Sequence, residues 1–166
     1  MPDKASEIEI SRYRSGDERD IVALILPIQT IEFGIETSAE KQPDLFDIAN
    51  FYQTGAGDFW IARHGPDIVG TIAMKDIGNG QALIRKMFVA AAFRGREYAL
   101  AARLLSTLVN KARTAQMSEI FLGTIDILRA ACRFYEKNGF AQIGREDLPA
   151  AFPVMAVDNT FYRLKL

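Results

Sequence analysis

The stretch that decides the fold is Val-Ala-Ala-Ala-Phe-Arg-Gly-Arg-Glu-Tyr-Ala-Leu-Ala-Ala-Arg-Leu-Leu, residues 89–105. It starts at the apolar end of an expected strand, passes through a basic turn, and continues as an amphipathic helix predicted over residues 95–115. The first turn of a helix has backbone N–H groups without intrahelical partners and the positive end of the macrodipole, so it attracts anions. Arg94 and Arg96 add full charges, while Gly95 and Ala99 let a ligand approach the backbone. The stretch therefore predicts a phosphate-binding turn.

The segments around this turn predict a mixed α/β sheet. Strands are expected over residues 83–89 and 119–124, and a strand, a crossover helix and a second strand imply a local parallel pair. The remaining pattern indicates antiparallel neighbours, which gives six to seven strands and about four helices. The other expected strands cover residues 8–14, 59–63, 68–75, 140–144 and 160–166. The other expected helices cover residues 17–34, 43–52 and 129–138. The first of these helices is expected to break at Pro27, and the last is expected to stop at Gly139.

Composition limits the classes of protein that remain. The 166 residues suit one domain, with 49% apolar and 25% charged residues. A net charge of −1 argues against a nucleic-acid partner. One cysteine, Cys132, excludes an internal disulfide and a cysteine-based zinc site. No run approaches the ~20 apolar residues of a membrane span, and the polar start is unlike a secretory signal, so we expect a cytoplasmic protein without a membrane partner.

Two phosphate-binding strings are absent, Gly-x-Gly-x-x-Gly and the glycine loop that ends in Lys-Ser or Lys-Thr. The chain instead resembles the GNAT N-acetyltransferase superfamily, whose acetyl-CoA loop reads Arg/Gln-x-x-Gly-x-Gly/Ala. Arg94 and Ala99 match its ends, and Glu97 replaces its central glycine. Residues 131–140, Ala-Cys-Arg-Phe-Tyr-Glu-Lys-Asn-Gly-Phe, are similar to the family string Ala-x-x-Phe-Tyr-x-x-x-Gly-Phe. The two motifs lie in register, so the resemblance extends over nearly the whole chain.

The resemblance implies a GNAT-like fold whose central parallel pair splays apart, with acetyl-CoA as co-substrate and no metal. It assigns cofactor binding to the end of the fourth strand and the turn after it: Met87, Phe88, Val89, Arg94, Gly95, Arg96, Glu97, Tyr98 and Ala99. Tyr135 matches the general acid, because a phenol of pKa ~10 can protonate a thiolate whose thiol has a pKa of ~8.5. A half-buried helix tyrosine packed beside Phe134 is the structural alternative.

The general base is less determined. Many family members have a glutamate on the fourth strand where this chain has Leu83. Glu32 is the first candidate, because it lies where the chain turns before Phe33-Gly34. Glu36, Asp76 and a water that relays the proton to a backbone carbonyl are the alternatives.

The acceptor is expected to be a primary amine of a small molecule or peptide. The loop over residues 148–155 is long enough to form a wall of its pocket, lined by Phe33, Tyr52, Phe152 and Met155. Arg85 and Lys86 are expected to alternate on their strand, so that one of them points away from the core.

These observations predict transfer of acetyl to the amine by direct attack in a ternary complex. Leu83 and Glu97 leave open a catalytically weak acyl-CoA sensor or partner-binding module, which acceptor-dependent release of CoA would distinguish. A toxin that acetylates aminoacyl-tRNA is disfavoured by the net charge. A homodimer is left open.

Overall fold

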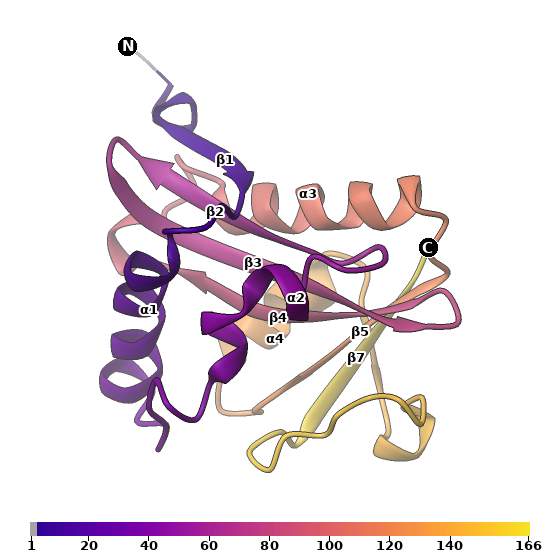
Figure 1. The fold of residues 1–166 in the computed structure, drawn as a ribbon. Coiled ribbons are helices and arrows are strands. Elements are labelled where there is room, and N and C mark those ends of the chain that lie inside the picture. Colours follow the sequence, from indigo (N-terminus) through magenta and orange to yellow (C-terminus); the bar gives the residue numbers. More distant parts are fainter. Residues whose placement is uncertain (1–2) are drawn as a thin grey trace.

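The computed structural model describes residues 3–166, which form a seven-stranded sheet in the order β1-β2-β3-β4-β5-β7-β6 (Figure 1). All neighbours are antiparallel except β4 and β5, so the predicted mixed sheet with one parallel pair is confirmed. The strands are β1 (Ile8–Arg12), β2 (Asp58–His64), β3 (Asp67–Gly78), β4 (Gln81–Val89), β5 (Glu119–Thr124), β6 (Ala141–Ile143) and β7 (Thr160–Lys165).

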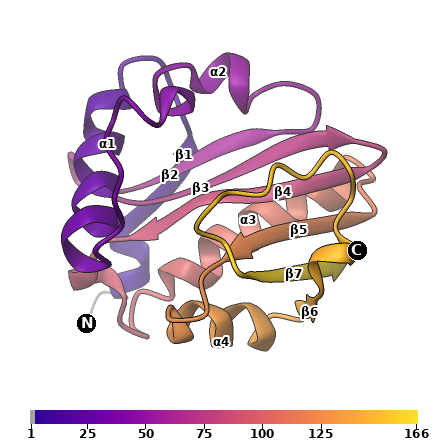
Figure 2. The same ribbon diagram turned by 90° about the horizontal axis from the view of Figure 1, so that it is seen from below.

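Helices cover both faces of the sheet. Figure 2 shows α1 and α2 on one side and α4 on the other, with the loop between β6 and β7 crossing above β4 and β5 on the side of α1 and α2. The helices are α1 (Glu18–Pro27), α2 (Ile48–Phe51), α3 (Leu100–Thr114) and α4 (Arg129–Lys137). Gly139, at a φ of 92°, ends α4 as predicted.

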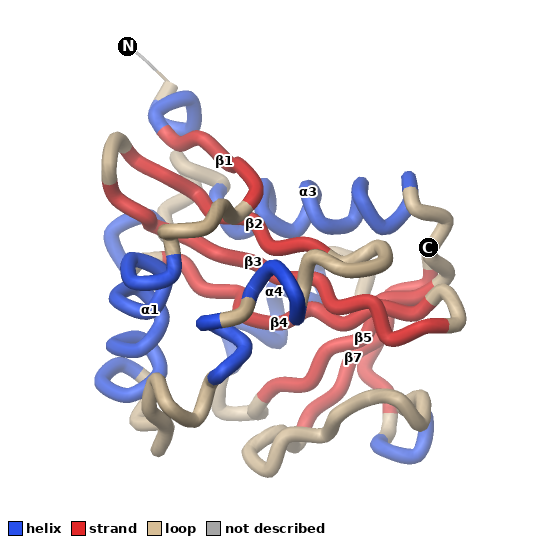
Figure 3. The backbone as a smooth tube through the Cα atoms, viewed as in Figure 1, coloured by secondary structure: helices blue, strands red, loops and turns tan. Residues whose placement is uncertain are grey.

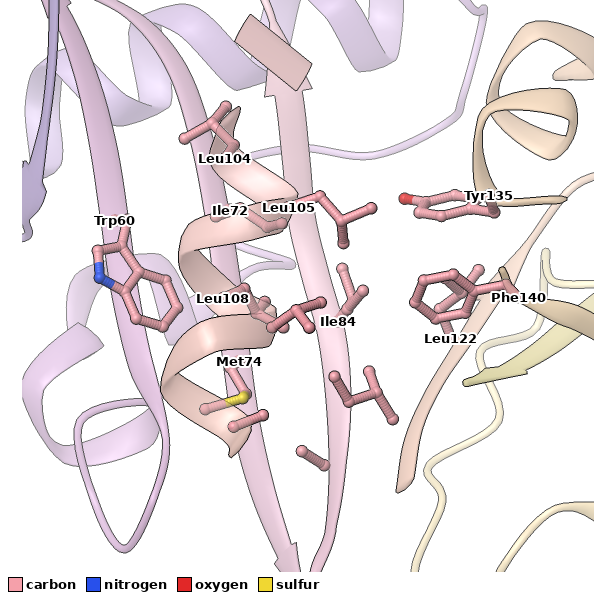
Figure 4. Close-up of a cluster of buried hydrophobic side chains, with 14 of the residues drawn as sticks. Trp60, Ile72, Met74, Ile84, Leu104, Leu105, Leu108, Leu122, Tyr135 and Phe140 are labelled. Atoms are coloured by element: carbon pink, nitrogen blue, oxygen red, sulfur yellow. The ribbon is translucent and has the colours of Figure 1, made fainter. Parts of the chain in front are cut away.

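Two hydrophobic layers fix these helices. The stripe of α3 packs against β3 and β4 together with α4, as Figure 4 shows for Leu104, Leu105 and Leu108 beside Ile72 and Ile84. On the opposite face, Ile21 and Ile25 of α1 pack with Leu45, Ile48 and Tyr52 against β2. In both segments the apolar residues at helical spacing therefore face the sheet, as the sequence predicts.

Two predicted helices differ in the structure. The helix expected over residues 43–52 is a 3₁₀ turn, Pro43–Phe46, followed by the short α2, because Asp47 between them has a φ of −145°. The helix expected from Gly95 begins only at Leu100, because Ala99 adopts the left-handed region with a φ of 48°. Residues 94–99 therefore form a loop between the strand and the helix. The break predicted at Pro27 is present, as α1 passes there into a π-helical turn, Ile28–Glu32.

The parallel strands β4 and β5 pair over only three residues. Gln81–Leu83 lie beside Glu119–Phe121, and beyond them the two strands diverge (Figures 1 and 3). A β-bulge lies in the part of β4 that pairs with β3 but no longer with β5. The register between β3 and β4 shifts there between Thr71 and Ala73 of β3. Lys86 in this bulge has a φ of 52°, and its carbonyl accepts a hydrogen bond of 2.7 Å from the Thr71 hydroxyl. Such a bulge bends its strand, which keeps β4 away from β5.

Candidate active site

Tyr135 on α4 lies at the divergence of β4 and β5. Its hydroxyl points toward β4 (Figure 4) and donates to the sulfur of Met87 at 3.4 Å. The ring is buried between Phe134 and Phe140, with centroids 5.5 and 5.6 Å away. A tyrosine of ordinary pKa is protonated at neutral pH, and burial raises the pKa of this phenol further. A protonated phenol thus faces the strand end for which the sequence predicts a thioester.

The loop between β4 and α3 contains the predicted phosphate-binding residues. The guanidinium of Arg94 donates to the carbonyl of Val89 at 2.9 Å, which ties the loop to the end of β4. Arg96 is exposed, and the first turn of α3 has no side-chain cap. Uncapped N–H groups and two arginines make this an anion-attracting loop.

Glu32, the first candidate for the general base, is joined to this loop. Its carboxylate accepts a hydrogen bond from each terminal nitrogen of Arg94 in a bidentate ion pair, and one of these contacts is 2.9 Å long. The hydrogen bonds from Arg94 lower the pKa of Glu32. A lowered pKa makes this carboxylate a weaker base and links the π-helical turn after α1 to the loop before α3.

The other carboxylates considered as bases lie elsewhere. The carboxylate of Asp76 accepts hydrogen bonds of 2.9 Å from the backbone N–H groups of Ala56 and Gly78, and so holds two turns together. Glu36 is exposed in the loop that follows the π-helical turn.

Glu97 folds back onto the loop that it belongs to. Its carboxylate lies directly over the α-carbon of Gly95, where a Cβ would contact it. The acidic charge at the place of the family's central glycine therefore lies beside the backbone of the predicted phosphate loop.

The bulge in β4 changes where two basic side chains point. The sequence predicts that Arg85 and Lys86 alternate across the strand, and this is wrong because the left-handed Lys86 inserts an extra residue. Both side chains lie on the face covered by α1 and α2: Lys86 donates to the side chain of Gln42 at 2.6 Å, and Arg85 lies 5.7 Å from the centroid of the Phe51 ring.

Lys86 belongs to a buried polar cluster. Its ammonium lies 3.6 Å from a carboxylate oxygen of Asp44, which also accepts the hydroxyl of Tyr52 at 2.5 Å. Desolvation lowers the pKa of Lys86, and Asp44 acts in the opposite direction. The cluster neutralises Asp44 and anchors the 3₁₀ turn before α2 to β4.

A pocket of about 310 Å³ opens beside this cluster. Arg85 forms part of its wall, and the other lining residues are Lys41, Pro43, Asp44, Asp47 and Phe51. Phe51 also lies 4.1 Å from the ammonium of Lys75, which donates to the Phe51 carbonyl. The aromatic ring and Lys75 hold the wall in place.

The four side chains predicted to line the acceptor pocket are not brought together. Tyr52 is fully buried in the cluster under α1, and Phe152 is buried with Leu83, Phe121 and Phe161. Phe33 and Met155 are partly exposed, at 38% and 46%. The loop between β6 and β7, which includes residues 148–155, crosses the sheet above β4 and β5 (Figure 2). This is the side of α1 and α2, the same side as the pocket lined by Phe51 and Arg85.

Sequence reasoning missed Asp158, at the end of that loop. A Cβ added to Gly123 of β5 would lie 2.5 Å from a carboxylate oxygen of Asp158, so the carboxylate rests directly on the strand. Burial raises the pKa of Asp158 to about 6, and the positive charge of Arg85 partly offsets this rise. The only sequence signal was an acidic residue just before the last strand.

Within residues 3–166 there is no group of three or more His, Cys, Asp or Glu side chains that could hold a metal ion. No helix of this part of the chain is both long and apolar enough to cross a membrane.

A family model described as acetyltransferase (GNAT) family matches residues 23–140. Mouse N-acetylaspartate synthetase is 33% identical over 107 residues, which are 63% of this chain and 35% of that protein. Mouse N-acetyltransferase 8F1 is 31% identical over 110 residues, which are 63% of this chain and 49% of that protein. The chain thus spans half or less of the length of these relatives.

Solved structures match over nearly the whole chain. An acetyltransferase of the GNAT family from Staphylococcus aureus has a TM-score of 0.90 at 36% identity, and 95% of this chain and 98% of that chain are covered. An acetyltransferase from Streptococcus agalactiae has a TM-score of 0.92 at 31% identity, with coverages of 96% and 99%. A GNAT family acetyltransferase from Elizabethkingia anophelis with acetyl-CoA bound shares the fold, with a TM-score of 0.63 at 18% identity and coverages of 96% and 99%.

Proposed function

The chain belongs to the acetyltransferase (GNAT) family, and on this premise we propose that it transfers an acetyl group from acetyl-CoA to a primary amine by direct attack in a ternary complex. The observation that carries the proposal is the buried, protonated hydroxyl of Tyr135, which faces Met87 where β4 leaves β5. A thioester between these strands would have a proton donor beside its sulfur.

Two features of the chain fit acetyl-CoA, and one opposes it. The loop over residues 94–99 offers Arg94, Arg96 and the uncapped start of α3 to a pyrophosphate, with Gly95, Tyr98 and Ala99 shaping the backbone. The strand end Met87 to Val89 does not pair with β5, so, apart from the Val89 carbonyl that Arg94 occupies, its backbone groups on that side can bind an amide-containing arm. Glu97 is the one charge that opposes a phosphate here.

The chemistry of transfer assigns a task to Tyr135. The amine nitrogen forms a bond to the thioester carbon, and collapse of the tetrahedral intermediate breaks the carbon–sulfur bond. The departing thiolate takes a proton from the phenol, and the proton that the amine nitrogen loses as the amide forms restores the phenol. A backbone N–H at the end of β4 directed at the developing oxyanion would contribute ~3 kcal/mol.

Glu32 has a different task from the one expected of a base. Its bidentate ion pair keeps Arg94 extended beside Val89, so we infer that Glu32 positions the phosphate-binding arginine. A role as base stays a prediction, which the kinetics of Glu32→Gln address in the Discussion.

The proposal is tested by incubating the protein with acetyl-CoA and a panel of amines, polyamines, amino acids and peptides. The expected result is release of CoA, measured by chromatography, that depends on one class of acceptor, together with the acetylated amine in the mass spectrum. Binding of acetyl-CoA with no acceptor-dependent release would overturn the proposal in favour of an acyl-CoA-binding module.

A further inference from the structure

Arg85 is a cation without an anionic partner. It forms none of the ion pairs found among residues 3–166. It is half-buried, and the regular alternation of β4 before the bulge places it on the face on which the pocket opens. A guanidinium offers donors in a planar fork that matches a carboxylate, so an unpaired arginine in a pocket wall suits an anionic ligand.

The other charges of the pocket do not cancel Arg85. Asp44 is already neutralised by Lys86 and by the hydroxyl of Tyr52. Asp47 is exposed and accepts the side-chain amide of Asn50 at 2.9 Å. Lys41, on the rim, adds a second positive charge that has no ion-pair partner in the described part of the chain. The pocket therefore favours a negative group at its Arg85 end.

Asp158 supplies the opposite charge on the same face of the sheet. It rests on Gly123, two residues beyond Phe121, the last residue of β5 that pairs with β4. Arg85 lies two residues beyond Leu83, the last residue of β4 that pairs with β5. The two side chains thus flank the divergence from its two strands, and Arg85 is near enough for its charge to act on Asp158. Tyr135 reaches the divergence from the opposite face.

We propose that the acceptor is an amine that also carries a carboxylate, as a free amino acid does, with its carboxylate bound by Arg85 and its nitrogen facing Asp158. This inference rests on the proposed acetyl transfer and names the substrate class of the same site. The carboxylate of Asp158 pairs with the ammonium form and first takes one proton from it, which frees the lone pair with which the nitrogen bonds to the thioester carbon. The thiolate that leaves takes its proton from Tyr135, and the second proton that the nitrogen loses as the amide forms restores the phenol. Asp158 releases its proton to solvent, so the transfer yields the amide, free CoA and one proton.

The first test compares amino acids with their amides. The amide keeps the reactive amine and lacks only the negative charge, so kcat/KM should be about 30-fold or more lower than for the acid. Arg85→Met should remove this preference by lowering kcat/KM for the acid alone, and Arg85→Lys should keep part of it. The matched control is Arg113→Met, which removes an exposed arginine at the end of α3 and should leave both substrates unchanged.

The second test addresses the nitrogen end of the acceptor. Asp158→Asn should lower kcat about 100-fold for acid and amide alike, because the loss affects the amine that both share. Asp67→Asn, at the exposed first residue of β3, is the control and should leave kcat unchanged. Far-ultraviolet circular dichroism and melting curves confirm that each variant is folded.

The outcomes separate the two proposals. Acetylation of amines with no preference for the acid over the amide, or a preference that survives Arg85→Met, overturns the acceptor class and leaves acetyl transfer intact. Absence of transfer to every amine overturns both. Calorimetric titration of amino acids into CoA-saturated protein gives a reading without turnover: tighter binding of the acid than of the amide is expected, and equal or absent binding contradicts the carboxylate role of Arg85.

Discussion

Replacing Tyr135 by Phe should separate catalysis from folding, because the hydroxyl contributes little to the fold. Its one hydrogen-bond partner among residues 3–166 is the sulfur of Met87 at 3.4 Å, a weak acceptor that loses little when left unpaired. The ring contacts with Phe134 and Phe140 remain in the variant. We therefore expect the free energy of unfolding to fall by less than about 1 kcal/mol, which is about 2–4 °C in Tm for a chain of this length.

The expected effect of Tyr135→Phe on turnover is much larger. A positioned proton donor contributes about 10²–10⁴ to the rate, equivalent to roughly 3–5 kcal/mol of transition-state stabilisation. The phenol cannot be replaced by water at this place, since the side chain is buried. We expect kcat to fall by at least about 100-fold while KM for acetyl-CoA stays within a factor of about three.

The assay is CoA release by chromatography with the best acceptor, together with thermal melting of the same samples. Tyr162→Phe is the matched control, since it also removes one buried phenolic hydroxyl, and the Tyr162 ring lies 6.1 Å from that of Tyr135. The hydroxyl of Tyr162 donates to Glu136 at 3.3 Å, so this variant should lose at least as much stability and keep its kcat. The reasoning is refuted if Tyr135→Phe keeps kcat within about threefold, or if both variants lose activity in proportion to their Tm.

Three further variants test the phosphate loop and Asp158. Glu97→Gln should lower KM for acetyl-CoA by about two- to tenfold with kcat unchanged, because it removes a negative charge beside the predicted pyrophosphate. A raised KM would instead mean that Glu97 caps the loop. Glu32→Gln should raise KM for acetyl-CoA severalfold by releasing Arg94, whereas a ~100-fold loss of kcat would identify Glu32 as the base. Asp158→Asn should raise Tm at pH 8 by about 2–4 °C and leave it unchanged near pH 4. The reason is that the folded state raises the pKa of Asp158 to about 6, so wild-type stability falls as pH increases through that value. An unchanged Tm at pH 8 would contradict the burial of this charge.

The architecture could be predicted because local patterns determine it. The apolar stripe of α3 and the β-branched run of β5 occur in the order that a right-handed crossover requires, and this order fixes the parallel pair. Gly139 ends α4 because only a residue that tolerates positive φ fits there. Each of these signals lies within one element.

The candidate site could be predicted only in part, because several of its contacts join distant segments. The ion pair between Glu32 and Arg94 links residues 62 positions apart, and either side chain alone is typical of a solvated surface. Asp158 gains its raised pKa from packing on Gly123, which depends on the path of a long loop. The left-handed Ala99 has no sequence signal at all, since alanine rarely adopts that conformation.

The bulge at Lys86 connects most of what distinguishes this site. One extra residue in β4 bends the strand away from β5, and the hydroxyl of Thr71 holds the bent strand by its carbonyl. The same insertion puts Arg85 and Lys86 on one face, so that Lys86 neutralises Asp44 and leaves Arg85 unpaired in the pocket wall. Alternation resumes after the bulge and turns Met87 to the other face, where it meets Tyr135. An unbulged strand would place either the arginine or the methionine on the wrong face, so the proton donor and the anion-binding arginine depend on the same backbone irregularity.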